Sequence, residues 1–238
     1  MVRWNDVHRP VWTGSISNEA AKREVAGVVA ARAEDGEVIG IGSGSTSFLA
    51  LIALADRVRS EGLGVRCVPT SHEIAGYCAD LGLDTTSLVD ARPDWCFDGA
   101  DEVDPARNLI KGRGGAFVRE KLVFAAAPKR FILVDDSKFV DRLGQKFAVP
   151  LEVIPEALEL VGAQLQDSLG VRPTVRPAGG KDGGVITEQG GLVLDLPLPP
   201  EVLADRSVTE LDALLNNTVG ITGTGLFAGF ELEVLSDS

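Results

Sequence analysis

The sequence predicts an α/β protein: a Rossmann-like, doubly wound parallel sheet with a second, smaller α+β domain. The first observation is a short apolar segment at 37–41 that leads through a Gly/Ser turn into a helical segment. The second is the repeat of this pattern, with a strand-like segment at 65–68 before a helix over about 71–80. The third is another strand-like segment, Trp95 to Phe97, that ends in an acidic turn. Alternating strands and helices are typical of parallel sheets, whose sites lie at the carboxyl ends of the strands.

A helix is also expected before the first strand, over residues 17–33. It starts with Ser and Asn, which are favoured at helix N-termini, and Lys22 lies one turn in. Its apolar residues recur at helical spacing: Ala21, Val25, Val28 and Val29.

The pattern changes after the apolar segment 131–134. Two prolines flank a short apolar run at 150–155, and a helix is expected from there to about residue 169. Two alternating runs at 184–187 and 192–196 are joined by Glu-Gln-Gly-Gly, which predicts a hairpin.

Two further elements complete the predicted domain organisation. Ser207 and Glu210 have the spacing of a capping box that opens a last short helix, and a final strand is expected over 226–235. We therefore expect residues 1–143 plus 216–238 to form the Rossmann-like catalytic domain. Residues 144–215 would form the small α+β domain.

Composition limits the class of protein. The 238 residues carry 23 Lys and Arg against 35 Asp and Glu, a net charge of 23 − 35 = −12, and 45% are hydrophobic. A core is therefore expected, disorder is not, and the lack of basic clusters argues against a nucleic-acid partner. The chain shows neither a run of about 18 apolar residues nor a secretion signal, so no membrane partner is expected. Three cysteines without CxxC spacing fit reduced, packed thiols, and we expect a cytoplasmic location.

The loop Gly42-Ser43-Gly44-Ser45-Thr46-Ser47 is a candidate anion site. Its glycines would let the backbone approach an anion, and the helix that follows would present free N–H groups. The loop lacks the lysine of a P-loop and the third glycine of the dinucleotide fingerprint, which argues against a nucleotide. The alternative is an ordinary Gly/Ser turn.

Two further segments carry candidate catalytic groups. In the first, Asp98-Gly-Ala-Asp101-Glu-Val-Asp104, carboxylates could bind sugar hydroxyls or transfer protons; the alternatives are a metal site or a solvated acidic turn. In the second, 111–121, Lys111 and a glycine-rich loop could stabilise an oxyanion before a helix whose second turn holds Glu120. A partly desolvated Glu120 could act as a base. The alternative is an exposed acid paired with Arg119 or Lys121.

The remaining chemistry-bearing residues give little support for metal or His-based catalysis. His8 and His72 are far apart and lack metal-ligand spacing, so neither a metal site nor a His-based triad is expected. Lys138, at another strand end, is a surface lysine by default. Trp4 and Trp12 lie in an N-terminal extension that we expect to pack against the body or a partner subunit.

Taken together, the order and spacing of these segments resemble ribose-5-phosphate isomerase of type A. The pair DGADE and KGxGG…REK is the most specific part of the resemblance. The matching segments are GSGST (42–46), TSHE (70–73), DGADEVD (98–104), KGRGGAFVREK (111–121), VDDSK (134–138), PLEVIP (150–155) and GLF (225–227).

The resemblance implies a cofactor-free isomerase that interconverts D-ribose 5-phosphate and D-ribulose 5-phosphate in the pentose phosphate pathway, as a homodimer or homotetramer. It implies Glu120 as the proton acceptor, with Lys111 and Asp98 around the reacting oxygens. The substrate-binding residues that it implies are Lys22, Ser43, Gly44, Ser45, Thr46, Asp98, Gly99, Ala100, Asp101, Lys111, Gly112, Arg113, Gly114 and Lys138. No metal ligand is implied.

The chain departs from the family's usual pattern in three places. Ser43 stands where Thr is common, 187–191 replaces a TDNGN-like turn, and 216–225 differs from a PGVVENG-like run. The last two concern the small domain and assembly. Two alternatives stay open: an isomerase of this fold for another aldose phosphate, and a non-catalytic domain that senses sugar phosphates.

Overall fold

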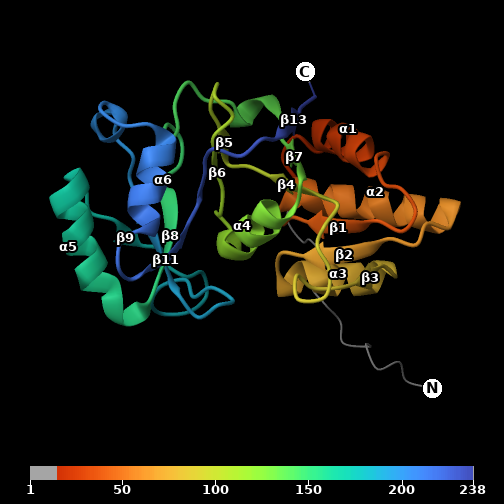
Figure 1. Cartoon of the computed structure of the whole chain (residues 1–238), viewed down its shortest axis with the longest axis horizontal. Coiled ribbons are helices and arrows are strands. Elements are labelled where there is room, and N and C mark those ends of the chain that lie inside the picture. Colours follow the sequence, from red (N-terminus) through yellow and green to blue (C-terminus); the bar gives the residue numbers. More distant parts are fainter. Residues whose placement is uncertain (1–14, 238) are drawn as a thin grey trace.

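The larger part of the structure is a six-stranded sheet. The computed structural model describes residues 15–237, so the expectations for Trp4, His8 and Trp12 lie outside it. The strand order is β13-β7-β4-β1-β2-β3 and every pairing is parallel (Figure 1). The predicted α/β fold with a parallel sheet is therefore confirmed. The strands are β1 (Val38–Ile41), β2 (Arg66–Pro69), β3 (Asp84–Thr85), β4 (Trp95–Gly99), β7 (Lys129–Leu133) and β13 (Glu233–Leu235).

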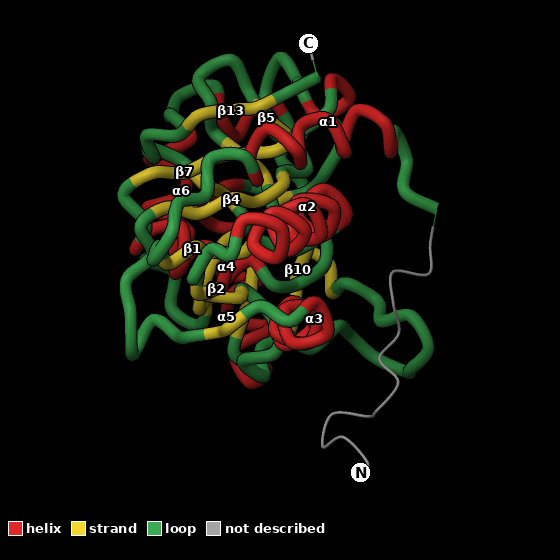
Figure 2. Tube along the Cα trace, turned by 90° about the vertical axis from the view of Figure 1, so that its right-hand side faces the viewer, coloured by secondary structure: helices red, strands yellow, loops and turns green. Residues whose placement is uncertain are grey.

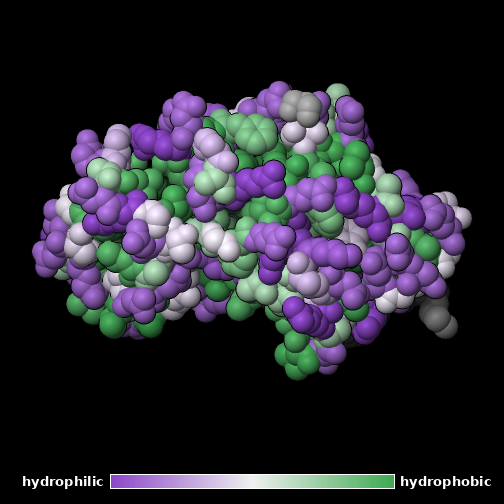
Figure 3. Space-filling view, turned by 45° about the horizontal axis from the view of Figure 1, so that its top comes forward, coloured by the Kyte–Doolittle hydropathy of each residue, from purple (hydrophilic) through white to green (hydrophobic). Residues whose placement is uncertain are grey.

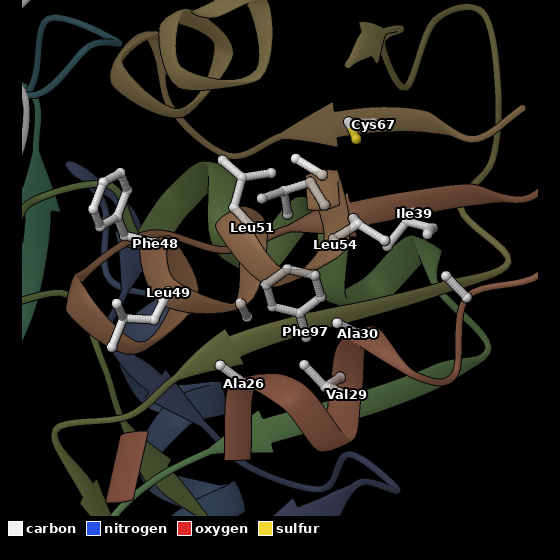
Figure 4. Packing of buried hydrophobic residues seen from close by; sticks show 14 of the residues in the cluster. Ala26, Val29, Ala30, Ile39, Phe48, Leu49, Leu51, Leu54, Cys67 and Phe97 are labelled. Atoms are coloured by element: carbon white, nitrogen blue, oxygen red, sulfur yellow. The ribbon is translucent and has the colours of Figure 1, made fainter. Parts of the chain in front are cut away.

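Helices cover both faces of this sheet. Figure 2 shows α1, α2 and α3 along one side of the stacked strands. Ile39, Phe97 and Cys67 point to that side and form one core with α1 and α2 (Figure 4). Val38 and Cys96 are the strand neighbours of Ile39 and Phe97. They pack with α4 on the other side, because successive side chains of a strand alternate between faces. The helices are α1 (Glu19–Ala30), α2 (Ser45–Glu61), α3 (His72–Leu81) and α4 (Phe117–Ala126).

A second sheet, of four antiparallel strands in the order β11-β8-β10-β9, lies at the other end of the molecule (Figure 1). Its strands are β8 (Val149–Val153), β9 (Thr174–Val175), β10 (Leu192–Leu196) and β11 (Ile221–Thr224). Helices α5 (Leu158–Leu169) and α6 (Val208–Asn216) pack on it and share its core. The predicted capping box at Ser207 and Glu210 is present at the start of α6.

Three short strands connect the two larger sheets: β5 (Glu102–Val103), β6 (Leu109–Ile110) and β12 (Leu226–Phe227). Single 3-10 turns are found at η1 (Asp136–Lys138), η2 (Pro155–Ala157) and η3 (Pro200–Leu203). Glu102 in β5 is fully buried and accepts hydrogen bonds from the backbone N–H groups of Gly144, Lys146 and Phe147 at 2.6, 2.5 and 2.7 Å. These bonds attach the segment before β8 to the connecting sheet.

Several local predictions need correction. Residues 184–187 form isolated bridges rather than a strand, because β10 pairs mainly with β8 and β9. The expected final strand over 226–235 is two strands, β12 and β13, in different sheets. Val28, expected on the buried face of the first helix, is 48% exposed. Strand β11 lies in the four-stranded sheet, although the predicted domain boundary groups 216–238 with the larger sheet; the division into domains stays a prediction.

The surface is mainly hydrophilic on the face that Figure 3 draws. Figure 3 shows one face covered mostly by hydrophilic side chains, with hydrophobic residues in smaller groups between them. Cys67, Cys78 and Cys96 are buried and none of them forms a disulfide. Within residues 15–237, none of the helices combines the length and the apolar character needed to cross a bilayer.

Candidate active site

The candidate site lies where the strand order reverses. Strands β1 and β4 are neighbours, but the chain proceeds from β1 to β2 on one side and from β4 to β7 on the other. Such a switch point leaves a crevice at the carboxyl ends of the two strands. The loop after β1 and the end of β4 meet there, since the N–H of Gly42 donates to the carbonyl of Phe97 at 2.8 Å.

One side of the crevice is the N-terminus of α2. Gly44 caps this helix with φ of +86°, a conformation that glycine adopts without strain, and the helix begins at Ser45. The first turn therefore directs free N–H groups and the positive end of the helix dipole into the crevice. The ammonium of Lys22, from α1, donates to the hydroxyls of Ser45 at 3.2 Å and Ser17 at 3.4 Å. A backbone anion site and a lysine are thus side by side.

Lys22 is almost fully buried, at 5% exposed. Burial lowers its pKa, an effect that the Asp135 carboxylate at 3.9 Å opposes and the nearby Lys138 reinforces. The pKa of Asp135 lies below its usual value despite burial, because Ser137, Asn18 and Lys22 stabilise its charged form. An anion in the crevice would add negative charge beside Lys22 and favour its protonated form.

The opposite side of the crevice holds two buried carboxylates and a lysine. The Lys111 ammonium lies 2.9 Å from Asp98 Oδ2 and 3.1 Å from Glu120 Oε2, and it donates to the carbonyl of Gly99 at 2.6 Å. All three charged side chains are 5% exposed or less. Glu120 Oε1 accepts a hydrogen bond from the Ser43 hydroxyl, whereas Oε2 accepts none from the described residues. Oε2 is thus a buried oxygen whose close neighbour is the ammonium of Lys111.

The electrostatics of this cluster depend on burial. Burial, together with the charge of Glu120, raises the pKa of Asp98 to about 7, against the opposing effect of Lys111. Burial alone would lower the pKa of Lys111, but Asp98 and Glu120 outweigh it and raise that pKa. Lys111 therefore stays charged, and Asp98 can gain or lose a proton near neutral pH.

Asp98 is oriented by several donors. Its Oδ1 accepts from the N–H of Gly99 at 2.7 Å, the N–H of Ser43 at 3.2 Å and the hydroxyl of Ser47 at 3.3 Å. A Cβ atom at Gly42 would overlap the Asp98 side chain, so only glycine leaves room there. The position of the carboxylate thus depends on the loop after β1.

Asp101 and the glycine-rich loop complete the crevice. Asp101 Oδ2 accepts from the N–H of Arg113 at 3.1 Å, and burial raises the pKa of this carboxyl although Lys111 opposes the shift. Gly112 has φ of +103°, and a Cβ there would overlap Phe117. The loop therefore needs glycine both for its turn and for its packing on α4.

A cavity of about 430 Å³ joins these groups. It brings together every predicted site residue except Asp98, which contacts the cavity residue Lys111 at 2.9 Å, and it adds Ser17. Its lining is Ser17, Lys22, Ser43, Gly44, Ser45, Thr46, Gly99, Ala100, Asp101, Lys111, Gly112, Arg113, Gly114, Glu120 and Lys138. A larger hollow of about 720 Å³ lies around Trp95 and Phe131. That hollow contains neither the helix N-terminus nor the buried acids, so we assign the chemistry to the smaller cavity.

The structure decides between several alternatives at Glu120 and the acidic segment. Glu120 lies in the first turn of α4, not the second, and is buried. Arg119 pairs instead with Glu188 at 2.5 Å, and Lys121 with Asp212 at 3.2 Å. The acidic segment is not a solvated turn, because Asp98, Glu102 and Asp104 are buried.

Sequence reasoning missed three side chains that support the site: Ser17, Ser47 and Asp135. Asp135 was visible as part of VDDSK, but its contact with Lys22 spans more than a hundred residues of sequence. Ser47 belongs to the predicted anion loop, but its bond to Asp98 was not foreseen, and Ser17 carried no signal beyond its hydroxyl. His72 is exposed and lies outside the cavity; its ring approaches Glu188 at 3.8 Å. No group of three or more His, Cys, Asp or Glu side chains among residues 15–237 is arranged to hold a metal ion.

Fold and site together define an α/β protein with a cavity between a helix N-terminus and a buried cluster of two carboxylates and a lysine. The family model for Ribose 5-phosphate isomerase A (phosphoriboisomerase A) matches residues 66–237. The chain belongs to the ribose 5-phosphate isomerase A family, which confirms the resemblance seen in its motifs.

Individual relatives agree over nearly the whole chain. "Ribose-5-phosphate isomerase A" of Synechococcus sp. is 45% identical over 218 residues, 90% of this chain and 91% of the relative. The protein of the same name from Methanothermobacter thermautotrophicus is 44% identical over 203 residues, 85% and 87% of the two chains. The ribose 5-phosphate isomerase A structure from Methanocaldococcus jannaschii superposes with a TM-score of 0.86 at 36% identity, covering 92% and 95%. A D-ribose-5-phosphate isomerase in complex with phospho-erythronic acid superposes with a TM-score of 0.84 at 33% identity, covering 91% and 95%.

Proposed function

We propose that the protein interconverts D-ribose 5-phosphate and D-ribulose 5-phosphate through an enediolate, with Glu120 as the base. The place of Glu120 carries the proposal: it is a buried carboxylate in the wall of the anion-binding cavity, and its Oε2 has the Lys111 ammonium, at 3.1 Å, as its close polar neighbour. A carboxylate oriented through its other oxygen by Ser43, beside a cation that can hold the substrate oxygen, suits proton abstraction next to a carbonyl.

The phosphate end of the substrate would bind at the N-terminus of α2. The N–H groups of residues 44–46 and the hydroxyls of Ser45 and Thr46 would donate to it, with charge from Lys22 and Lys138. This places the sugar across the cavity, with its carbonyl end towards Lys111. Asp101 would hold a sugar hydroxyl.

The proton transfer then follows from the cluster. Glu120 removes the proton from C2 of the open-chain aldose, and the electron pair moves into the C1–O1 carbonyl to give the enediolate. Lys111 and the 112–115 loop stabilise the negative oxygen. Asp98, whose pKa is about 7, moves a proton between O2 and O1. Glu120 returns its proton to C1, which completes the ketose with no net loss of atoms or charge.

Assembly and location are proposed on the same basis. The family's reaction belongs to the pentose phosphate pathway, and a homodimer or homotetramer in the cytoplasm fits the acidic chain. No metal or organic cofactor takes part in the steps above.

The test is an isomerisation assay with the purified protein on a panel of pentose and hexose phosphates. Conversion of ribose 5-phosphate with the highest kcat/KM supports the proposal, and Glu120→Gln should then lose about 10²- to 10⁴-fold in kcat. If another aldose phosphate is converted faster, that sugar replaces ribose 5-phosphate as the proposed substrate, and the proposed mechanism stays the same. Binding of ribose 5-phosphate without any turnover would indicate a sensing domain instead.

A further inference from the structure

Arg176, in the segment after β9, contacts the glycine-rich loop of the site from the second sheet. Its guanidinium Nη1 donates to the carbonyl oxygens of Gly112 at 2.9 Å and Arg113 at 2.8 Å. It lies outside the cavity lining and does not reach the space where substrate would bind. We propose that Arg176, held by Asp195, is a positioning residue that fixes the peptide units of the 112–114 loop, so that the N–H of Arg113 reaches Asp101 and the N–H of Gly114 faces the reacting oxygen. This inference rests on the proposed isomerase function.

The guanidinium is itself held in one orientation. Nε donates to Asp195 Oδ2 at 3.0 Å and Nη2 to Asp195 Oδ1 at 2.5 Å, the two-pronged geometry that arginine forms with a carboxylate. Both side chains are partly buried, at 15% and 27% exposed. The backbone of Arg176 is fixed as well, because its N–H donates to Val193 and its carbonyl accepts from Val185, each at 2.9 Å. Arg176 is therefore a rigid donor.

Holding two successive carbonyls determines where the amides point. In a trans peptide the C=O and N–H groups point in opposite directions, and the described residues contain no cis peptide. With the carbonyls of Gly112 and Arg113 turned to Arg176, the N–H groups of Arg113 and Gly114 face the other way. The Arg113 N–H bonds to Asp101 at 3.1 Å, which shows this direction, and Gly114 lines the cavity.

The charge of Arg176 has a second effect. A cation at the carbonyl end of a peptide unit polarises it and makes its N–H a stronger donor. Lysine keeps the charge but presents a single ammonium, so it cannot hold both carbonyls and both Asp195 oxygens in a plane. The planar guanidinium with its several N–H donors, rather than the positive charge alone, fits the contacts that Arg176 makes.

The test compares Arg176→Ala, Arg176→Lys and Asp195→Asn with the wild-type enzyme. Because misplacement of an oxyanion donor by about 1 Å costs on the order of 100-fold, Arg176→Ala should lower kcat by about that factor. The KM for ribose 5-phosphate should change less than about threefold, since the phosphate is bound by a different loop. Arg176→Lys should recover only a part of kcat, and added guanidinium should raise kcat of Arg176→Ala.

A binding measurement separates positioning from a purely structural role. Phospho-erythronic acid carries a carboxylate whose two oxygens resemble those of an enediolate, and it is the molecule bound in a solved relative. Its affinity should fall in Arg176→Ala by about the same factor as kcat, while that of inorganic phosphate should not change. Arg142→Ala is the matched control, because Arg142 also donates to two carbonyls, Leu143 at 3.3 Å and Leu198 at 3.0 Å, away from the loop.

The outcomes are distinct. If Arg176→Ala unfolds at a lower temperature but keeps kcat and analogue affinity in its folded fraction, as the control does, the positioning role is wrong. If Arg176→Ala does not fold, the same comparison is made with Arg176→Lys and Asp195→Asn. If the wild-type protein does not isomerise ribose 5-phosphate at all, the proposed function fails, and that result is independent of Arg176.

Discussion

Replacing Gly42 by alanine should disable the site through a single methyl group. The new Cβ would overlap Cβ, Cγ and Oδ1 of Asp98, and Gly42 is not among the glycines with positive φ, so backbone strain is not the cause. Asp98 must move, which disturbs its bonds to Ser43, Ser47 and Gly99 and its 2.9 Å contact with Lys111.

The size of the effect can be worked out from these contacts. Overpacking by one methyl group costs about 1–3 kcal/mol where side chains can adjust, as a carboxylate can by rotation. For a chain of this length, each kcal/mol lowers Tm by roughly 2–4 °C, so a decrease of about 2–12 °C is expected. Displacement of the reacting group by about 1 Å should lower kcat by roughly 100-fold.

Thermal unfolding and steady-state kinetics of the same preparation measure both effects. Gly36→Ala is the control: Gly36 has φ of +82°, no atom lies within 4 Å of the position that its new methyl group would take, and it is not part of the cavity lining. It should lose about 1–2 kcal/mol of stability from backbone strain, because an L-residue is disfavoured in the left-handed region, and keep its kcat. If Gly42→Ala keeps kcat at the level of Gly36→Ala, then the position of Asp98 does not limit the reaction.

Three further predictions concern the charged groups. The pKa of Asp98 is about 7 in the folded protein, above the unfolded value near 3.8. The wild type should therefore lose stability relative to Asp98→Asn as pH rises from about 4 to 7, by up to ~1.4 kcal/mol per pH unit. If urea titrations show the same pH dependence for both proteins, the raised pKa is refuted. Thr46→Val and Lys22→Ala should each raise KM for ribose 5-phosphate by about one to two decades, since a hydrogen bond to a charged group contributes roughly 1.5–3 kcal/mol. If these variants lose activity on unphosphorylated ribose in equal proportion, the phosphate binds elsewhere. Activity should survive dialysis against EDTA. If activity is lost on dialysis and returns only when Mg²⁺ is added, Asp98 and Asp101 are metal ligands.

The fold and the site differ in how far the sequence could predict them. Apolar runs such as 37–41 and the glycines that follow are local signals, and they predicted the sheet and the loop correctly. Strands were harder to predict where the apolar pattern does not show which sheet a segment joins. Residues 226–235 contain enough apolar residues for one strand, but tertiary pairing divides them between two sheets. Burial of Glu102 could not be seen, because the N–H groups that compensate its charge come from residues more than forty positions away.

The site itself was found from motif order rather than from periodicity. Spacing suggested that Asp98, Lys111 and Glu120 could meet at a strand end, but not that Lys111 lies between the two carboxylates. Arg176 and Asp195 gave no signal in the sequence, since an arginine and an aspartate near a hairpin are ordinary surface residues. The role that we propose for them depends on a contact with a loop about sixty residues earlier in the chain.

The three hydrogen bonds to Glu102 have a consequence for motion within the protein. The irregular segment 144–147 carries the chain towards β8, and such segments usually exchange their amide protons quickly. Here the N–H groups of Gly144, Lys146 and Phe147 all end on one buried carboxylate, so opening this segment would leave that carboxylate without its donors. We expect slow exchange at these amides, and little movement of the segment 144–147 relative to β5 during a turnover.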